Sequence, residues 1–216
     1  MMDMSCVNRA EALRYMGCKG EPDESLKNLL EDCLDQLGEV CEPRHLTASF
    51  PLKLGAKDTI DAQCFQTESR ALAHNLADCD EILLFAATLG TGVDHLIRRY
   101  SRLEMSRAVA LQAASAAAIE AYCNGVCKEL RAEYEAKGRY LRPRFSPGYG
   151  DFPLSCQPAI LGALEAGKRI GIKLTDSFLM MPSKSVSAVM GISKKPRHCS
   201  VEGCEVCTKK DCLYRR

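Results

Sequence analysis

The spacing of apolar residues predicts helices in the first part of the chain. Between residues 21 and 41, leucines and a cysteine recur at intervals of three and four, which places them on one face of a helix. Pro22, followed by Asp23 and Glu24, suits the first turn of that helix. A shorter amphipathic helix is predicted over residues 8–17. We therefore expect an N-terminal helical segment.

Further along the chain, strand-like runs alternate with helical ones. The continuous apolar run at 80–90 predicts a buried strand, and the β-branched and aromatic residues of 44–54 predict another. Two more strand-like runs occupy 173–181 and 184–193. Helices are expected at 67–79, 92–103, 105–138 and 156–167. This order predicts an α+β fold: a single domain with a mostly antiparallel twisted sheet flanked by helices.

The pattern divides the chain into three parts. Residues 1–43 form the N-terminal helical segment, and residues 44–195 form the main α+β domain. Residues 196–216 are polar, basic and dense in cysteine, and we interpret them as a cysteine-rich C-terminal tail. The long helix predicted at 105–138 is rich in alanine, so another backbone can approach it closely.

Composition narrows the classes of function. The formal net charge is +1 and aromatic residues are only 6%, with no tryptophan, so the sequence offers no case for nucleic-acid binding. No apolar run is long enough to cross a membrane, and the N-terminus lacks the apolar stretch of a signal peptide. We therefore expect a cytoplasmic protein without a membrane partner. Its 13 cysteines should be reduced thiols or metal ligands there.

Residues 142–153, "RPRFSPGYGDFP", stand out because no regular helix or strand favours such a mixture. Pro147 restricts the backbone, while Gly148 permits positive φ and close approach of a ligand. Arg144 offers a planar fork that suits a carboxylate, and Tyr149 a flat apolar face with a polar tip. Two interpretations are open at this point: a ligand-binding loop, or a connector whose arginines point into water.

The tail contains the second candidate site. Its four cysteines, Cys199, Cys204, Cys207 and Cys212, lie within fourteen residues and include a Cys-x-x-Cys pair. That spacing lets one loop offer two thiolates to one metal, and it suits either zinc or an iron–sulfur cluster. The alternative is a tail of reduced cysteines that binds no metal. The other cysteines are scattered, and we expect Cys123 and Cys127, one helical turn apart, to be core residues.

Three motifs carry a family resemblance. The order Arg-x-x-Pro-Gly-Tyr at 144–149, "KLTDSFLMMPSKSVSA" at 173–188 and "AAIEAYCNGVCKELR" at 117–131 resemble the activation domain of cobalamin-dependent methionine synthase. The likeness covers roughly residues 80–193. The chain departs from the family where Phe145 and Ser146 replace Pro-Ala, and where Met181 replaces a tryptophan.

The resemblance implies a binding site for S-adenosylmethionine. Arg144 resembles the arginine that pairs with the carboxylate of the ligand, and Tyr149 the tyrosine beside it. Pro147 and Gly148 complete the same loop. Glu120 is placed as the family glutamate that meets the cationic end of the ligand; the alternative for this residue is an exposed glutamate on a long helix.

The resemblance also implies a repair function. Cobalamin that has been oxidised to an inactive form would be reduced by one electron and then methylated by S-adenosylmethionine. The chain has no Asp-x-His-x-x-Gly pattern for ligating cobalamin, so the cobalamin would be carried by a partner: a methionine synthase subunit or another corrinoid protein. A flavodoxin or ferredoxin would be the electron donor. We expect no catalytic acid or base, and hence a component of a methyltransferase system rather than a self-sufficient enzyme.

Two other functions remain open. The cysteine tail could form a redox module that delivers electrons to a corrinoid methyltransferase protein. Alternatively, the chain could be a non-catalytic partner that only caps such a protein.

Overall fold

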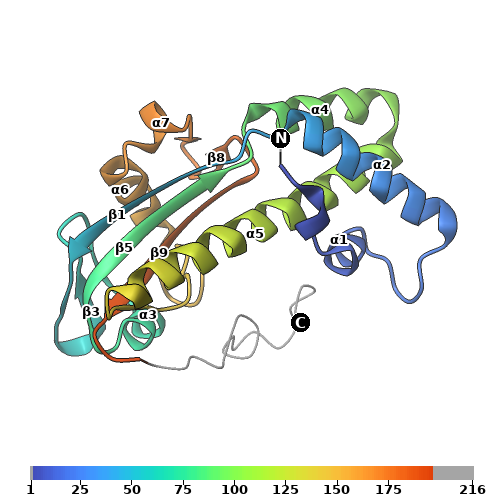
Figure 1. Ribbon diagram of the computed structural model, residues 1–216. Helices are drawn as coiled ribbons and strands as arrows, with labels where there is room; N and C mark the ends of the chain where they lie inside the picture. The colour runs from blue at the N-terminus through green and yellow to red at the C-terminus, as the bar shows by residue number, and fades with distance from the viewer. Residues whose placement is uncertain (1, 197–216) are drawn as a thin grey trace.

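The computed structural model describes residues 2–196 of the 216-residue chain. Its centre is a four-stranded antiparallel sheet in the order β1-β5-β9-β6 (Figure 1). The strands are β1 (Arg44–Pro51), β5 (Cys79–Thr88), β9 (Ser185–Ser193) and β6 (Tyr140–Leu141). The predicted α+β fold with an antiparallel sheet is therefore confirmed, and so are the strands expected within 44–54, 80–90 and 184–193.

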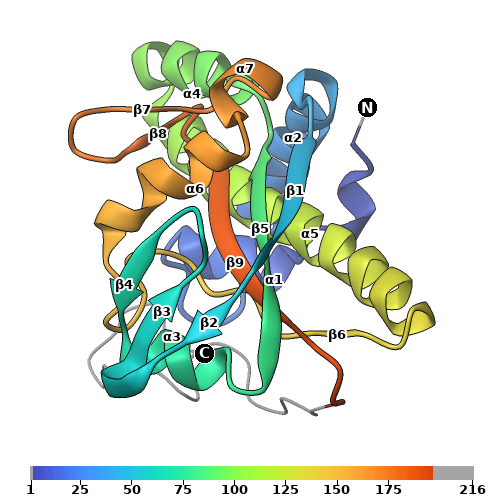
Figure 2. The same cartoon turned by 90° about the vertical axis from the view of Figure 1, so that its left-hand side faces the viewer.

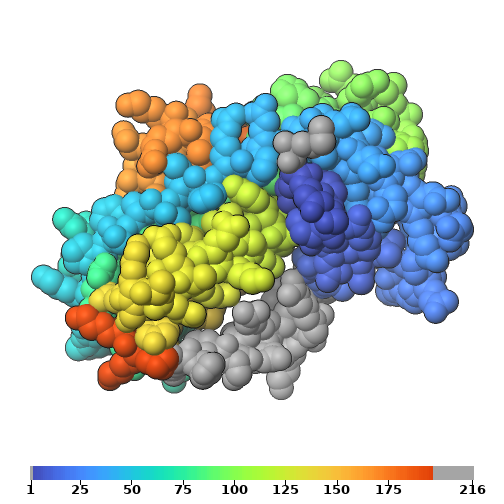
Figure 3. All heavy atoms as spheres, in the orientation of Figure 1, coloured from blue at the N-terminus to red at the C-terminus, as the bar shows by residue number. Residues whose placement is uncertain are grey.

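Four helices cover one face of this sheet. They are α1 (Arg9–Tyr15), α2 (Glu24–Val40), α4 (Thr91–Leu103) and α5 (Met105–Ala136). Alternate residues of β5 and β9, among them Phe85 and Met190, point into the apolar core beneath the helices. The alanines of α5 are largely buried in the same core. In Figure 3 the C-terminal half of α5, in yellow, is exposed beside the blue N-terminal helices.

The opposite face of the sheet has a mixed layer (Figure 2). Its helices are α3 (Arg70–Asn75), α6 (Gln157–Ala163) and α7 (Ala166–Arg169). A small sheet joins β2 (Lys53–Leu54), β3 (Thr59–Asp61) and β4 (Gln66–Glu68). A hairpin pairs β7 (Lys173–Leu174) with β8 (Met180–Met181). Single turns of 3-10 helix occupy Met4–Cys6, Ala56–Asp58 and Leu154–Cys156.

One predicted strand is wrong in detail. Residues 173–181 do not form a continuous strand, because the chain turns back between β7 and β8. The Thr175 N–H donates to the Leu179 carbonyl (2.9 Å), and the Leu179 N–H donates to the Thr175 hydroxyl (3.1 Å). Phe178 takes a positive φ of 61° in this turn. The polar Thr-Asp-Ser sequence therefore ends the strand after two residues.

The N-terminal helices share one apolar cluster with α5. Leu30 and Leu34 of α2 are buried in that cluster together with the β5 side chains. A shared core does not test where one segment ends and the next begins, so the boundary between residues 43 and 44 stays a prediction. Within residues 2–196, no helix combines the length and the apolarity needed to span a membrane; the cytoplasmic location likewise stays a prediction.

Candidate functional site

The loop that follows β6 lies against the edge of the central sheet. Phe145 and Val189 exchange both backbone hydrogen bonds, each at 2.9 Å. Successive side chains of an extended chain point to opposite faces. Phe145 therefore packs towards the α3–α6 layer, with its ring 6.3 Å from that of Phe152, whereas Arg144 points to the α5 side.

The rest of this loop is held in one shape by its glycines and by Asp151. Gly148 has a φ of +91° and its N–H donates to the Phe152 carbonyl (2.8 Å). A Cβ on Gly150 would lie 3.0 Å from the Ala71 methyl, so a larger residue would not fit without movement. The Asp151 carboxylate accepts from the Ala71 N–H (3.1 Å) at the start of α3. The loop is thus anchored to two neighbouring elements.

Asp151 is a charged anchor. Its carboxylate also accepts from the Ser69 hydroxyl and from the Arg70 N–H (2.8 Å). The hydrogen bond from Ser69, together with those from the backbone, lowers the pKa of Asp151. A carboxylate at the first turn of a helix is favoured by the backbone dipoles that point at it.

Arg144 is held against α5 by two acceptors. Its Nη2 donates to Asn124 Oδ1 (2.7 Å) and to Glu120 Oε2 (3.1 Å). The Arg144 side chain is only 16% exposed and that of Glu120 is 39% exposed. Burial opposes the charge of Arg144, yet the pKa of Arg144 is raised, because the Glu120 carboxylate that it contacts favours the cation. The interpretation of this loop as a connector with water-exposed arginines is therefore wrong: Arg144 is mostly buried and Arg142 is 1% exposed.

Two thiols lie close to the guanidinium of Arg144. Cys123 and Cys127 are buried in the core of the helical layer, which confirms the expectation for them. Burial raises the pKa of Cys123 to about 12. Both groups are neutral thiols at physiological pH, and neither has the exposure of a nucleophile.

One face of α5 links this end of the site to the second family motif. Gln112, Ala116, Glu120 and Asn124 are four residues apart, so they form a row of about 18 Å along the helix. At the far end, Lys184 Nζ donates to Gln112 Oε1 (2.7 Å). Burial lowers the pKa of Lys184. A hollow of about 510 Å³, lined by Tyr15, Gln112 and Ala116 among others, lies along this row.

The segment before β9 is fixed to the start of α4. The Asp94 carboxylate accepts from the Ser183 N–H (2.8 Å) and from the Ser183 hydroxyl. Ser185 Oγ donates to the Pro182 carbonyl (2.7 Å). These contacts position Lys184 beside α5.

The structure brings together some of the predicted site residues. Glu120 and Arg144 are in direct contact, so they do not stand on opposite sides of a gap as a sandwiched ligand would require. Pro147 is buried, Gly148 is exposed and Tyr149 is 69% exposed. Sequence reasoning missed Asn124 and Lys184. The signal for Asn124 was its position one helical turn after Glu120.

The predicted metal site cannot be placed. Cys199, Cys204, Cys207 and Cys212 lie outside the described residues, and their role as ligands stays a prediction. Within residues 2–196, no group of three or more histidine, cysteine or acidic side chains is arranged to hold a metal ion.

Comparison with known proteins finds a matching family model and a solved structure of similar fold. The family model "Vitamin B12 dependent methionine synthase, activation domain" matches residues 66–215. A solved structure described as "Crystal Structure of the MetH Reactivation Domain bound to AdoHcy" is similar, with a TM-score of 0.65 and 21% identity. The match covers 89% of this chain and 76% of that one, and it shows a common fold. No curated protein matches the sequence.

Proposed function

Because the chain belongs to the activation-domain family of vitamin B12 dependent methionine synthases, we propose that it binds S-adenosylmethionine and supports reactivation of a corrinoid carried by a separate protein. The observation that carries the proposal is the placement of Arg144 over Glu120 and Asn124 of α5. The solved structure of similar fold is described as bound to AdoHcy, a ligand of the same chemical type.

The donor set fits an amino-acid moiety. A planar guanidinium binds a carboxylate by donating paired hydrogen bonds to it, and the orientation of the Arg144 guanidinium is already held here by its hydrogen bond to Asn124. Glu120 supplies a negative charge for the ammonium or sulfonium of the ligand. Tyr149, at the tip of the anchored loop, offers an exposed ring against which an apolar part of the ligand can pack.

Binding requires the Arg144–Glu120 contact to rearrange. The carboxylate of the ligand and that of Glu120 both need the same guanidinium, which Glu120 contacts at 3.1 Å. Arg144 keeps its hydrogen bond to Asn124 while it turns towards the ligand, and Glu120 is freed to meet the cationic group. Asn124 is therefore the residue that preserves the orientation of Arg144 during this exchange.

The chemistry resides in the ligand and in the corrinoid of the partner. When bound, S-adenosylmethionine supplies a methyl group for cobalamin that an electron donor has reduced by one electron. This chain would hold the ligand, orient its methyl group towards the partner and exclude water. We propose a flavodoxin or ferredoxin as the donor, and the tail cysteines as ligands of zinc or an iron–sulfur cluster, on the basis of their spacing.

Titration calorimetry with S-adenosylmethionine and S-adenosylhomocysteine tests ligand binding. Arg144→Ala should weaken binding of both ligands by about 1.5–3 kcal/mol, the scale of a hydrogen bond to a charged group. Arg139→Ala is a matched control, because Arg139 is also a mostly buried arginine, with its side chain 18% exposed, and it pairs with the carboxylates of Asp80 and Glu81. Absence of binding by the native chain, or equal affinity of the native and Arg144→Ala proteins, contradicts the assignment.

A further inference from the structure

The corner between α4 and α5 carries a cluster of exposed apolar side chains. Leu103, Met105 and Val109 are 68%, 64% and 47% exposed. Three of the eight large apolar residues that are exposed within residues 2–196 thus fall between positions 103 and 109. Such clustering, in contrast to single exposed residues, marks a surface that another molecule covers.

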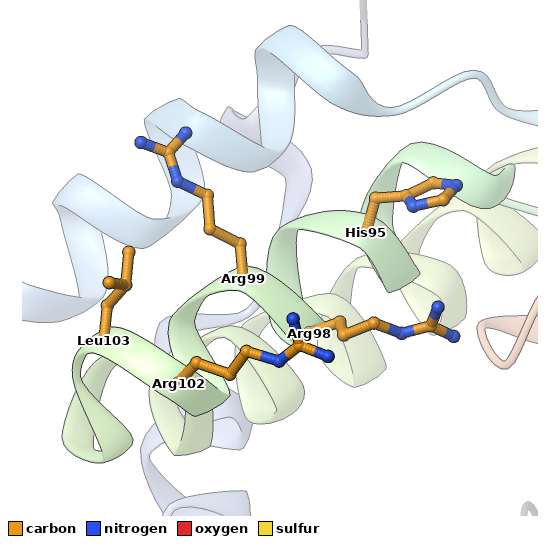
Figure 4. Close-up of a pocket in the computed structure, with 5 residues that line it drawn as sticks. All are labelled: His95, Arg98, Arg99, Arg102 and Leu103. Atoms are coloured by element: carbon orange, nitrogen blue, oxygen red, sulfur yellow. The ribbon is translucent and has the colours of Figure 1, made fainter.

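Basic side chains of α4 border this cluster. His95, Arg98 and Arg102 share one side of the helix, and Figure 4 shows the Arg98 and Arg102 side chains extending along it. Within residues 2–196, neither Arg98 nor Arg102 forms a hydrogen bond or an ion pair with another residue. The guanidinium carbon of Arg99 lies 5.8 Å from the centre of the Tyr100 ring. The net charge of the chain is only +1, so this is a local excess of positive charge.

The composition favours a protein partner over a small anion. Arginine and methionine around an apolar centre are typical of protein interfaces, in which charged residues form the rim. The basic hollow of about 350 Å³ is open and includes Leu103. A small anion would leave the neighbouring apolar residues in water, whereas a protein surface would cover both.

The corner is also continuous with the candidate ligand site. Met105 and Val109 line the same hollow as Gln112 and Ala116. Ala116 is one turn from Glu120 on the same face of α5. A partner seated on the corner would therefore reach the ligand site along α5.

We propose that Arg98, Arg102, Leu103, Met105 and Val109 form a docking patch for a carboxylate-rich surface of the corrinoid-carrying protein. The apolar residues would form the centre of the interface, and the arginines would pair with acidic residues at its rim. The inference rests on the proposed function for the nature of the partner. The surface itself is identified by its exposure, by arginines that have no hydrogen-bond or ion-pair partner among residues 2–196, and by its continuity with the site.

Binding kinetics of the full chain with its cobalamin-loaded corrinoid protein test the docking patch. The double variant Arg98→Glu/Arg102→Glu should lower the association rate about tenfold at about 0.05 M salt. The difference should shrink at about 0.5 M salt, where surface charges are screened. Leu103→Ser/Met105→Ser should instead raise the dissociation rate about tenfold, because it removes the apolar centre.

A matched charge reversal serves as control. Lys53 and Lys168 are exposed and lie in the layer on the opposite face of the sheet, so Lys53→Glu/Lys168→Glu changes the net charge equally without touching the patch. This control should bind the corrinoid protein with nearly native rates.

Three outcomes would overturn the docking patch. The first is that the corrinoid protein does not bind the chain, and the second is that the patch and control variants bind it with equal rates. The third is that the patch variants no longer bind an acidic electron carrier but still bind the corrinoid protein. S-adenosylmethionine titration of the same preparations separates the two proposals. If the ligand binds all variants equally and the corrinoid rates do not change, the docking patch fails and the proposed function stands.

Discussion

The contact between Glu120 and Arg144 leads to a prediction that depends on the charge of the ligand. Glu120→Gln keeps the size of the side chain and an oxygen that can accept from Arg144. It removes only the negative charge that we assign to the cationic group of the ligand. The variant should therefore fold normally and bind S-adenosylmethionine more weakly.

The magnitude follows from two opposing effects. Two unit charges 4 Å apart attract by about 1 kcal/mol in water and by about 4 kcal/mol near a protein surface. Glu120 is 39% exposed, so its attraction for the ligand should lie in the lower half of this range, at about 1–2 kcal/mol. The variant also weakens the contact that competes with the carboxylate of the ligand for Arg144, which returns about 0.5 kcal/mol. The net loss is about 1 kcal/mol, or a roughly fivefold weaker Kd.

Titration calorimetry with three ligands makes the assay specific. S-Adenosylhomocysteine lacks the sulfonium charge, and methylthioadenosine lacks sulfonium, ammonium and carboxylate. If Glu120 meets the ammonium, Glu120→Gln should weaken the binding of S-adenosylmethionine and of S-adenosylhomocysteine equally. If it meets the sulfonium, S-adenosylmethionine alone should lose affinity. Methylthioadenosine should be unaffected in either case.

The reasoning would be refuted by an unchanged Kd for both amino-acid ligands. It would also be refuted by a tighter Kd for S-adenosylmethionine, because Glu120 would then act only as a competitor for Arg144. Glu129→Gln is the control, since Glu129 is an exposed glutamate of the same helix and should leave all three affinities unchanged.

Other predictions concern stability and metal content. Gly191→Ala should destabilise the fold by about 1–3 kcal/mol in chemical unfolding, because the new Cβ would lie 2.4 Å from Cys79 Sγ. Gly125→Ala, with no atom within 4 Å, should instead stabilise it by about 1 kcal/mol; equal effects would refute the packing argument. The folded-state pKa of Asp151 is lowered, so its charge stabilises the fold above the unfolded-state pKa, and this contribution is lost as the pH falls through the folded-state pKa. Asp151→Asn should cost about 0.3–1 kcal/mol at pH 7 and progressively less below about pH 4, which unfolding curves at several pH values would show; a difference independent of pH would contradict it. Elemental analysis of anaerobically purified full chain should find one metal centre that disappears when the four tail cysteines are replaced by serine, and identical metal content would exclude the tail as its ligand.

The periodic segments of the fold could be predicted from the sequence. The continuous apolar run of β5 reflects burial on both faces of the sheet, and the leucine spacing of α2 reflects burial on one side of the helix. The small sheet of β2, β3 and β4 could not be predicted, because its strands are only two or three residues long and only one of their residues, Ile60, is fully buried. Their pairing depends on neighbours in space rather than on a local pattern.

Only part of the candidate site could be predicted from the sequence. The mixture of proline, glycine and arginine in 142–153 identified an unusual loop, and the three motifs related it to a family. The sequence did not show that Arg144 contacts Asn124 and Glu120. This contact depends on β6 and on the Phe145–Val189 pairing, which bring the loop against α5. The role of Asp151 as an anchor for the loop required the position of α3, which is 80 residues away in the chain.

The most direct test of the central claim is reductive methylation of cobalamin. The corrinoid-carrying protein, in its one-electron-oxidised inactive form, is mixed with this chain, an electron donor and S-adenosylmethionine, and its visible spectrum is followed. The account predicts formation of methylcobalamin only when this chain and S-adenosylmethionine are both present, and strongly reduced formation with Arg144→Ala. Equal methylation without this chain, or with Arg144→Ala, would contradict it.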